Sequence, residues 1–417
     1  MTEPADVSTR ADCEALDRAD PLRAMRGRYV LPAGLLYLDG NSLGALPAAT
    51  PARVARAVEA EWGQHLIGGW LKDGWMTLPE RLGDKVASLV GADPGEILVV
   101  DTTSLNLHKV LAAALQLRPE RRTLLTDSGN FPTDVYMAQG LAALLDRGHK
   151  VKVVAEGEIE AAIDEDTAAL FLTEVNYKSG RLHDMARLTE AAQAKGALAI
   201  WDLAHTAGAV PIHLNAAKAD FAVGCGYKYM NGGPGAPAWL FVARRHQDKV
   251  RQPLTGWLGH ADPFAFGLDY QPARGILQWK CSSPPILGLV ALEVSVDLLL
   301  EAGIEAIRAK SLRLTGLFMQ LVDRRLGGHG FTVATPREPA RRGSQVALQH
   351  EKSWPIMQAL FARGVIGDFR APDIARFGFA APYTGYADVW DAVEILREIM
   401  VNDTWRMPEF QMKKSVT

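Results

Sequence analysis

The feature that most constrains this chain is the alternation of two hydrophobic periods between about residues 84 and 243. Amphipathic helical stretches, such as 104–117, 132–148 and 184–196, separate many short apolar runs. Strands that are apolar on both faces and are joined by helices are typical of a parallel sheet covered on both sides. The pattern predicts an α/β fold with a mostly parallel seven-stranded sheet. The seven runs are "EILVVD" (96–101), "RTLLTD" (122–127), "KVKVVA" (150–155), "AALFLTEV" (168–175), "LAIWDL" (198–203), "FAVGCG" (221–226) and "AWLFVA" (238–243).

The segments that flank this region predict a second, smaller domain. A long helix is expected over about 284–326 with a break near Gly303, and shorter strands and helices follow it. The chain has 417 residues, which is more than a single hydrophobic core usually accommodates and about right for two domains. We expect a large α/β domain over 61–289, and a small α+β domain formed by 1–60 together with 290–417.

Charge and cysteine content exclude several classes of function. The chain has 45 basic and 48 acidic residues, so its net charge of −3 offers no electrostatic footprint for nucleic acid. Three cysteines without a CxxC spacing argue against a disulfide framework and a zinc site, and they fit a reducing compartment. The N-terminal stretch is charged, and the longest apolar run is interrupted by Glu293 and Asp297. We expect a cytoplasmic protein that binds neither membrane nor nucleic acid.

Ligands of open α/β sheets bind at the carboxyl ends of the strands, so the residues that follow each strand are candidates for chemistry. After the first strand, Thr102, Thr103 or Ser104 is placed to cap the next helix. The unpaired N–H groups at a helix N-terminus hold phosphate well. A hydroxyl cap alone is a weak signal, because most helices have one.

Two further strands end in residues with a possible chemical role. Phe131 and Asp134 follow "RTLLTD", where the aromatic ring could stack on a flat ligand or serve as a hydrophobic staple. Asp202 and His205 follow "LAIW". A buried acid needs a partner, which could be a metal ion or a cationic ring nitrogen. No third ligand and no H-x-x-x-H spacing accompanies the pair, so we expect no metal site.

Lys228 lies between two tyrosines in "GYKYMNGGPG", directly after a predicted strand. An apolar, aromatic pocket disfavours the ammonium form, so such an amine can attack a carbonyl. Taken alone, Lys228 would be an ordinary salt-bridged lysine. A capped helix, a stacking aromatic, a strand-end acid and a strand-end lysine together supply each contact that pyridoxal 5'-phosphate requires.

With these residues in place, the chain resembles the kynureninase family of pyridoxal-phosphate enzymes, which have the aspartate-aminotransferase-like fold (fold type I). The resemblance covers nearly the whole chain. It implies hydrolytic cleavage of the Cβ–Cγ bond of L-kynurenine to anthranilate and L-alanine, within tryptophan catabolism, by a homodimer. The motifs that carry it are "YLDGNSLG" (37–44), "NFPTD" (130–134), "WDLAHTAGAVP" (201–211), "GCGYKYMNGGPG" (224–235), "GWLGH" (256–260) and "RFGF" (376–379).

The resemblance implies a role for each candidate residue around the cofactor ring. Lys228 would form the Schiff base, and Asp202 would pair with the ring nitrogen. Phe131 would cover the ring, and His205 would lie near the phenolic oxygen. Asp134 would fix the cofactor and the nearby side chains.

The resemblance also assigns residues to the phosphate and to the substrate. Arg376 would clamp the substrate α-carboxylate, for which a planar guanidinium is suited. Tyr227 is either an acid/base or a phosphate contact only. Gln64 stands where animal relatives have histidine, which leaves the choice between kynurenine and 3-hydroxykynurenine open. The phosphate set is Thr103, Ser104 and Tyr227, with Trp257 and Ser283 from a second subunit, and the substrate set is Arg376, Ser42 and Gln64.

Other functions remain to be separated from this one. A cysteine desulfurase or selenocysteine lyase needs a nucleophilic cysteine in the C-terminal part, and no cysteine follows Cys281. An aminotransferase shares the lysine, the acid and the arginine clamp, so sequence excludes it less firmly. A catalytically silent binding protein of this fold is disfavoured by the presence of both Lys228 and Asp202. A nicotinamide enzyme is poorly supported, because no G-x-G-x-x-G joins a strand to a helix.

Overall fold

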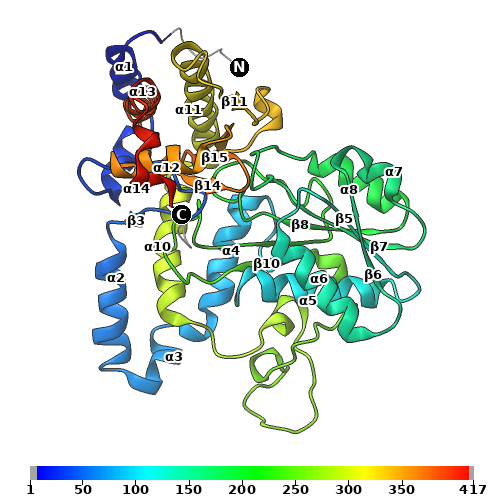
Figure 1. The fold of residues 1–417 in the computed structure, drawn as a ribbon. Coiled ribbons are helices and arrows are strands. Elements are labelled where there is room, and N and C mark those ends of the chain that lie inside the picture. Colours follow the sequence, from blue (N-terminus) through cyan, green and yellow to red (C-terminus); the bar gives the residue numbers. More distant parts are fainter. Residues whose placement is uncertain (1–6, 413–417) are drawn as a thin grey trace.

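A computed structural model describes residues 7–412. Figure 1 shows two units side by side: a large sheet covered by helices, and a smaller unit rich in helices. The large sheet has seven strands in the order β4-β10-β9-β8-β7-β5-β6. Only β10 runs antiparallel to its neighbours, and the other pairs are parallel. The predicted fold class is therefore confirmed. The strands are β4 (Ile97–Val99), β5 (Thr123–Asp127), β6 (Lys150–Val154), β7 (Thr167–Thr173), β8 (Leu198–Asp202), β9 (Phe221–Gly224) and β10 (Trp239–Val242).

The central strands are apolar throughout because helices cover both faces of the sheet. On β7, Phe171 belongs to one core and its neighbours Leu170 and Leu172 belong to the other, as the alternation of side chains along a strand requires. Helices α5 (Thr103–Leu117) and α6 (Pro132–Leu145) contribute to the first core. The second core contains residues of α4 (Leu78–Val90), α8 (Met185–Ala194) and α10 (Ile286–Ala302).

The smaller unit is built on a four-stranded antiparallel sheet in the order β11-β12-β15-β14. Helix α10 ends at Gly303, whose φ of 76° interrupts the helix, and α11 (Ile304–Arg325) begins directly after it. The break predicted near Gly303 is confirmed. The other elements of this unit are β11 (Thr332–Val333), β12 (Gln345–Gln349), α12 (Ser353–Ala362), β13 (Val365–Ile366), β14 (Asp368–Arg370), β15 (Ile374–Gly378), α13 (Tyr386–Val401) and α14 (Pro408–Gln411).

The N-terminal segment packs on this C-terminal unit. Strand β2 pairs in parallel with β13, and α1 lies beside α13 in Figure 1. These contacts support the division into 61–289 and 1–60 with 290–417, which stays a prediction. The remaining elements are α1 (Arg10–Ala19), β1 (Tyr29–Val30), β2 (Leu36–Tyr37), β3 (Leu46–Pro47), α2 (Thr50–Arg56), α3 (Gly69–Lys72), α7 (Ile159–Ala162) and α9 (Arg244–Gln247). Between residues 7 and 412, no helix combines the length and the apolar character needed to cross a bilayer.

Candidate active site

The loop after β9 holds Lys228 in an aromatic setting. Its amine lies 5.7 Å from the centre of the Phe131 ring and 5.8 Å from that of Tyr227. The Nζ atom is also 2.9 Å from Nε2 of His205. Phe131 is the residue that precedes α6, and His205 follows β8, so three strand ends meet at this amine.

A tight turn follows Lys228, and the 40–44 segment packs against the lysine loop. Asn231, Gly233 and Gly235 have φ angles of 56°, 86° and 77°, as expected for the "NGGPG" turn. Gly44 approaches so closely that a Cβ atom there would lie 2.4 Å from the carbonyl oxygen of Lys228. The "GNSLG" segment can therefore pack directly against the lysine loop.

Asp202 and Asp134 are buried carboxyl groups that contact each other close to the Lys228 amine. Asp202 ends β8, and one of its oxygens accepts a hydrogen bond from the Ala204 N–H at 2.8 Å. Asp134 lies in the first turn of α6, and Thr173 donates to its Oδ2 at 3.4 Å.

The environments of the two carboxyl groups change their pKa values to different extents. Burial raises the pKa of Asp134 well above its ordinary range, and the neighbouring charge of Asp202 raises it further. Burial also raises the pKa of Asp202, but the Lys228 cation opposes this effect. Asp134 therefore retains a proton more readily, and Asp202 is the better partner for a cation.

The N-terminus of α5 lines one end of a cavity of 640 Å³ beside the lysine loop. Thr102 is the capping residue, and its hydroxyl accepts from the N–H of Leu105 at 3.4 Å. Thr103 and Ser104 are therefore the first residues of the helix, where free N–H groups attract a phosphate. The cavity wall also includes Ser42, Leu43, Asp101, Cys225, Tyr227, Pro285 and the 234–238 segment.

Arg376 enters from the small sheet and is almost fully buried on β15. Its Nε donates to Oδ1 of Asp368 at 2.8 Å, and its Nη2 donates to Oδ2 of the same carboxylate. Nη2 is also 3.0 Å from the hydroxyl of Ser42, and Nη1 donates to the carbonyl of Tyr177. Asp368 thus holds the guanidinium through Nε and Nη2, and Ser42 accepts from the second N–H of Nη2.

Three predicted residues stand apart from this group. Gln64, Trp257 and Ser283 are exposed, and within residues 7–412 no side-chain hydrogen bond or ring contact joins them to Lys228 or to its neighbours. Trp257 and Ser283 belong to adjacent segments, since a Cβ atom on Gly256 would lie 1.8 Å from the carbonyl oxygen of Cys281.

The structure adds residues that sequence reasoning missed. Asp368 lies opposite Arg376 in the antiparallel register of β14 and β15, and the short hairpin between them is a signal that could have identified it. Lys109 is completely buried and bonds Oδ2 of Asp101 at 2.5 Å under the α5 N-terminus. Gln345 contacts His205 from the small sheet, and no local pattern in "SQVALQ" points to this contact.

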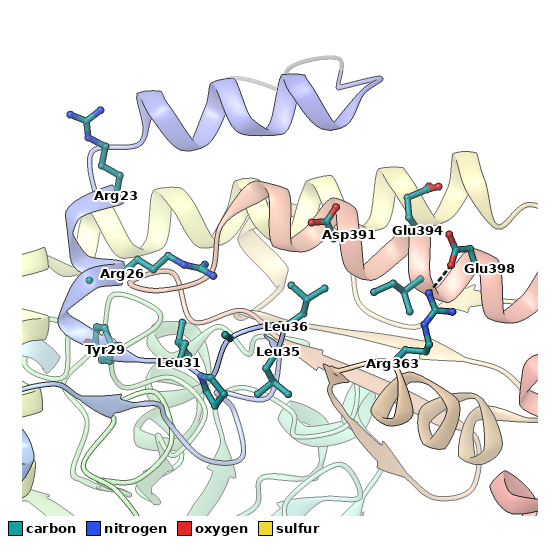
Figure 2. A pocket seen from close by; sticks show the side chains of 15 residues that line it. Arg23, Arg26, Tyr29, Leu31, Leu35, Leu36, Arg363, Asp391, Glu394 and Glu398 are labelled. Atoms are coloured by element: carbon teal, nitrogen blue, oxygen red, sulfur yellow. Dashed lines mark hydrogen bonds and ion pairs between the residues drawn. The ribbon is translucent and has the colours of Figure 1, made fainter.

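A second cavity, of 900 Å³, lies elsewhere in the molecule (Figure 2). It is bounded by the 23–36 segment and by α13, and the ion pair between Arg363 and Glu398 closes one side at 2.8 Å. None of the predicted site residues lines it. Although this cavity is larger, three of the predicted site residues, Ser42, Thr103 and Tyr227, line the cavity of 640 Å³ instead.

The residues around Lys228 fit pyridoxal phosphate. A buried acid suits the cationic ring nitrogen, Phe131 suits the ring face, and the α5 N-terminus suits the phosphate. Solved structures with the same fold include cysteine desulfurases from Thermococcus onnurineus NA1 and Escherichia coli, with TM-scores of 0.77 and 0.75 and identities of 18% and 17%. The alignments cover 91% and 95% of this chain and 98% and 99% of those chains. Fold and site together define a pyridoxal-phosphate enzyme of fold type I.

Within this class, the kynureninases of Pseudomonas fluorescens and Burkholderia pseudomallei (strain 1106a) are 49% and 48% identical to this chain over 416 residues. Each alignment covers 99% of this chain and 100% of the relative. The model of the kynureninase C-terminal domain also matches residues 307–396. The chain therefore belongs to the kynureninase family.

Proposed function

We propose that this enzyme hydrolyses the Cβ–Cγ bond of L-kynurenine to give anthranilate and L-alanine in tryptophan catabolism. The observation that carries the proposal is the position of the Lys228 amine, 2.9 Å from His205 and close to the buried Asp202. Family membership supports the same reaction.

Each residue around the ring has a distinct task in this proposal. When bound, pyridoxal phosphate links to an amine through its aldehyde and withdraws electrons from the carbon next to that amine. Lys228 would hold the aldehyde, and the carboxylate of Asp202 would keep the ring nitrogen protonated. Phe131 would cover one face of the ring, and His205 would lie near its phenolic oxygen. Asp134, which retains a proton more readily, orients Asp202.

Two side chains are placed to move protons. The amine of Lys228 would be the base for the substrate Cα proton. Burial raises the pKa of the Tyr227 phenol, so this group keeps its proton and can donate it to the alanine side of the cleaved bond. Tyr227 also lines the cavity with Thr103, so it can contact the phosphate as well.

Arg376 binds the α-carboxylate of the substrate in this proposal. Asp368 takes the Nε proton and one N–H of Nη2, Ser42 takes the other N–H of Nη2, and the Tyr177 carbonyl takes one N–H of Nη1. The substrate carboxylate would therefore take the remaining N–H of Nη1 and would replace Ser42 at Nη2. Ser42, beside Nη2, flanks the amino-acid end of the substrate. Gln64 is assigned to the aromatic end of the substrate. Rates on kynurenine and on 3-hydroxykynurenine will show which of the two substrates the enzyme prefers.

We also propose a homodimer in which the cofactor phosphate is shared. Thr103 and Ser104 come from one subunit, and the exposed Trp257 and Ser283 come from the other. The loop that follows Trp257 exposes three large apolar side chains, Phe264, Phe266 and Leu268, at 61%, 75% and 103% of their full area. Apolar side chains this exposed are typical of an interface between subunits.

Two related reactions are separated from this one by simple observations. Among the cysteines, Cys13 and Cys225 are buried, which does not suit the accessible nucleophile of a desulfurase. The desulfurase-like solved structures are 17–18% identical and share the fold alone. An aminotransferase would release a keto acid, whereas kynurenine hydrolysis releases an aromatic amine.

We assign the protein to the cytoplasm, since its free cysteines fit a reducing compartment, and cell fractionation tests this assignment.

Replacement of the lysine tests the function. We expect Lys228→Ala to lower kcat for anthranilate release from L-kynurenine by at least ~10³-fold, because the variant lacks the amine assigned both to the cofactor aldehyde and to the substrate Cα proton. The exposed Lys352, which pairs only with Glu351, provides the matched control, and Lys352→Ala should retain full activity. Anthranilate fluorescence measures the rate. If Lys228→Ala turns over kynurenine normally, the assignment of this lysine is wrong.

A further inference from the structure

The imidazole of His205 is held from both sides by side chains of different domains. Its Nε2 lies 2.9 Å from the amine of Lys228, and its Nδ1 lies 3.2 Å from Oε1 of Gln345. His205 and Gln345 are both buried, so water does not compete for these contacts. The protonation of the two ring nitrogens is therefore decided by these two neighbours.

The orientation of the Gln345 amide is determined by its other contacts. Its Nε2 donates to the carbonyl oxygens of Asn176 at 3.1 Å and of Tyr177 at 3.0 Å. A flipped amide would place its oxygen against two other oxygens and lose both bonds. The amide oxygen therefore faces His205, where it can only accept a proton from Nδ1.

The lysine side leads to the same arrangement. A lysine ammonium carries only donors, so Nε2 of His205 must accept from it. Burial lowers the pKa of His205 well below its ordinary value, and the cations of Lys228 and Arg376 lower it further. The ring is therefore neutral with a single N–H, and both neighbours favour that proton on Nδ1.

We propose that Gln345 is a positioning residue of the reaction, which holds His205 as the Nδ1–H tautomer and so turns the lone pair of Nε2 toward Lys228. The proposal rests on the assigned role of Lys228. It also links the domains, because Gln345 lies on β12 of the small sheet and its amide bonds the Asn176–Tyr177 backbone of the large one. The Tyr177 carbonyl accepts from Arg376 as well. Arg376, assigned to the substrate carboxylate, and Gln345, which contacts His205, therefore bind the same carbonyl oxygen.

The test is ¹⁵N NMR of the full chain, labelled at histidine and recorded before pyridoxal phosphate is added, when the Lys228 amine is free to donate to Nε2, with the His205 signals identified by their loss in His205→Gln. We expect His205 of the unmodified protein to be protonated at Nδ1 and not at Nε2. In Gln345→Met, which has no acceptor, this fixed tautomer should be lost, and kcat/KM for L-kynurenine should fall at least ~10-fold. Gln345→Glu keeps an acceptor for the Nδ1 proton but loses the bonds to Asn176 and Tyr177, so Nδ1 should stay protonated while kcat/KM falls.

A matched control is available on the same strand. Gln349 lies at the exposed end of β12 and donates to Asp373, so Gln349→Met should change neither the His205 signals nor kcat/KM. Protonation at Nε2 in the unmodified protein would overturn the inference even if Gln345→Met fails to fold, and so would an unchanged tautomer in a folded Gln345→Met. If the protein turns over kynurenine normally but His205 is protonated at Nε2, this inference is wrong and the proposed function stands. If His205 has the predicted tautomer but kynurenine is not turned over, the proposed function is wrong and this inference stands.

Discussion

At the scale of single residues, the site is made of buried charges that are matched to one another. The carboxylate of Asp368 neutralises Arg376 and also accepts from Arg370 at 2.7 Å. An unpaired buried charge would cost several kcal/mol, so removal of one partner would destabilise the other. This pairing explains how a guanidinium that is proposed to bind an anionic substrate can be buried without one.

Glu174 is a buried acid that forms no direct ion pair within residues 7–412, although the charge of Arg308 acts on it, and it makes stability depend on pH. It follows β7, its Oε2 has no hydrogen-bond partner among the described residues, and burial raises its pKa to about 8 from 4.5. The folded chain therefore keeps a proton that the unfolded chain releases above pH ~4.5. Stability contributed by this group is present at low pH and is lost as the pH rises toward 8.

We predict that Glu174→Gln reduces this alkaline loss. Between pH 6 and pH 9, the Tm of the unmodified protein should fall further than that of Glu174→Gln, by at least ~2 °C. Differential scanning calorimetry on the cofactor-loaded protein measures both. The exposed Glu351 is the control, since Glu351→Gln should behave like the unmodified protein. Identical pH dependence in the Glu174→Gln variant would show that Glu174 is ionised in the fold.

At the scale of elements, the junction of α10 and α11 depends on Gly303. Its φ of 76° and ψ of 126° suit only glycine, although no atom would crowd an added Cβ. We predict that Gly303→Ala lowers the free energy of unfolding by about 1–3 kcal/mol through backbone strain alone.

A second glycine provides the matched comparison. Gly140 is exposed in the middle of α6 and also has open space around it, so Gly140→Ala should raise the free energy of unfolding by about 0.5–1 kcal/mol. Urea unfolding measures both variants, and kcat should be unchanged in each. A shift of the same sign in the two variants would contradict this account of the junction.

Most elements could be predicted from the sequence because each carries its own period. The seven strands of the large sheet and the Gly303 break are local patterns of apolar residues and glycine. The very short β2 and β13 were not predicted, because each has two residues and gains its structure only from the other. The same reason explains the site: Lys228 and Asp202 follow strands of the large sheet, whereas Gln345 reaches His205 only once the small sheet has packed beside the large one.

At the scale of the whole molecule, the proposed sharing of the phosphate site between subunits predicts that two inactive variants restore each other's activity. Lys228→Ala and Trp257→Ala damage different subunits of one site, so a mixed dimer contains one site with both changes and one with neither. We expect co-assembly of equal amounts to recover about a quarter of the normal activity per site, at a cofactor concentration that leaves Trp257→Ala unloaded. Light scattering should show dimers throughout. No recovery in verified mixed dimers would place Trp257 in the same subunit as its Lys228.

The most direct test of the whole account is the covalent link between the cofactor and the chain. The purified protein, loaded with pyridoxal phosphate, should show a visible absorbance band that borohydride bleaches. Peptide mass spectrometry of the reduced protein should then find the cofactor on Lys228. Attachment to a different lysine, or a reduced protein that carries no cofactor, would contradict the account.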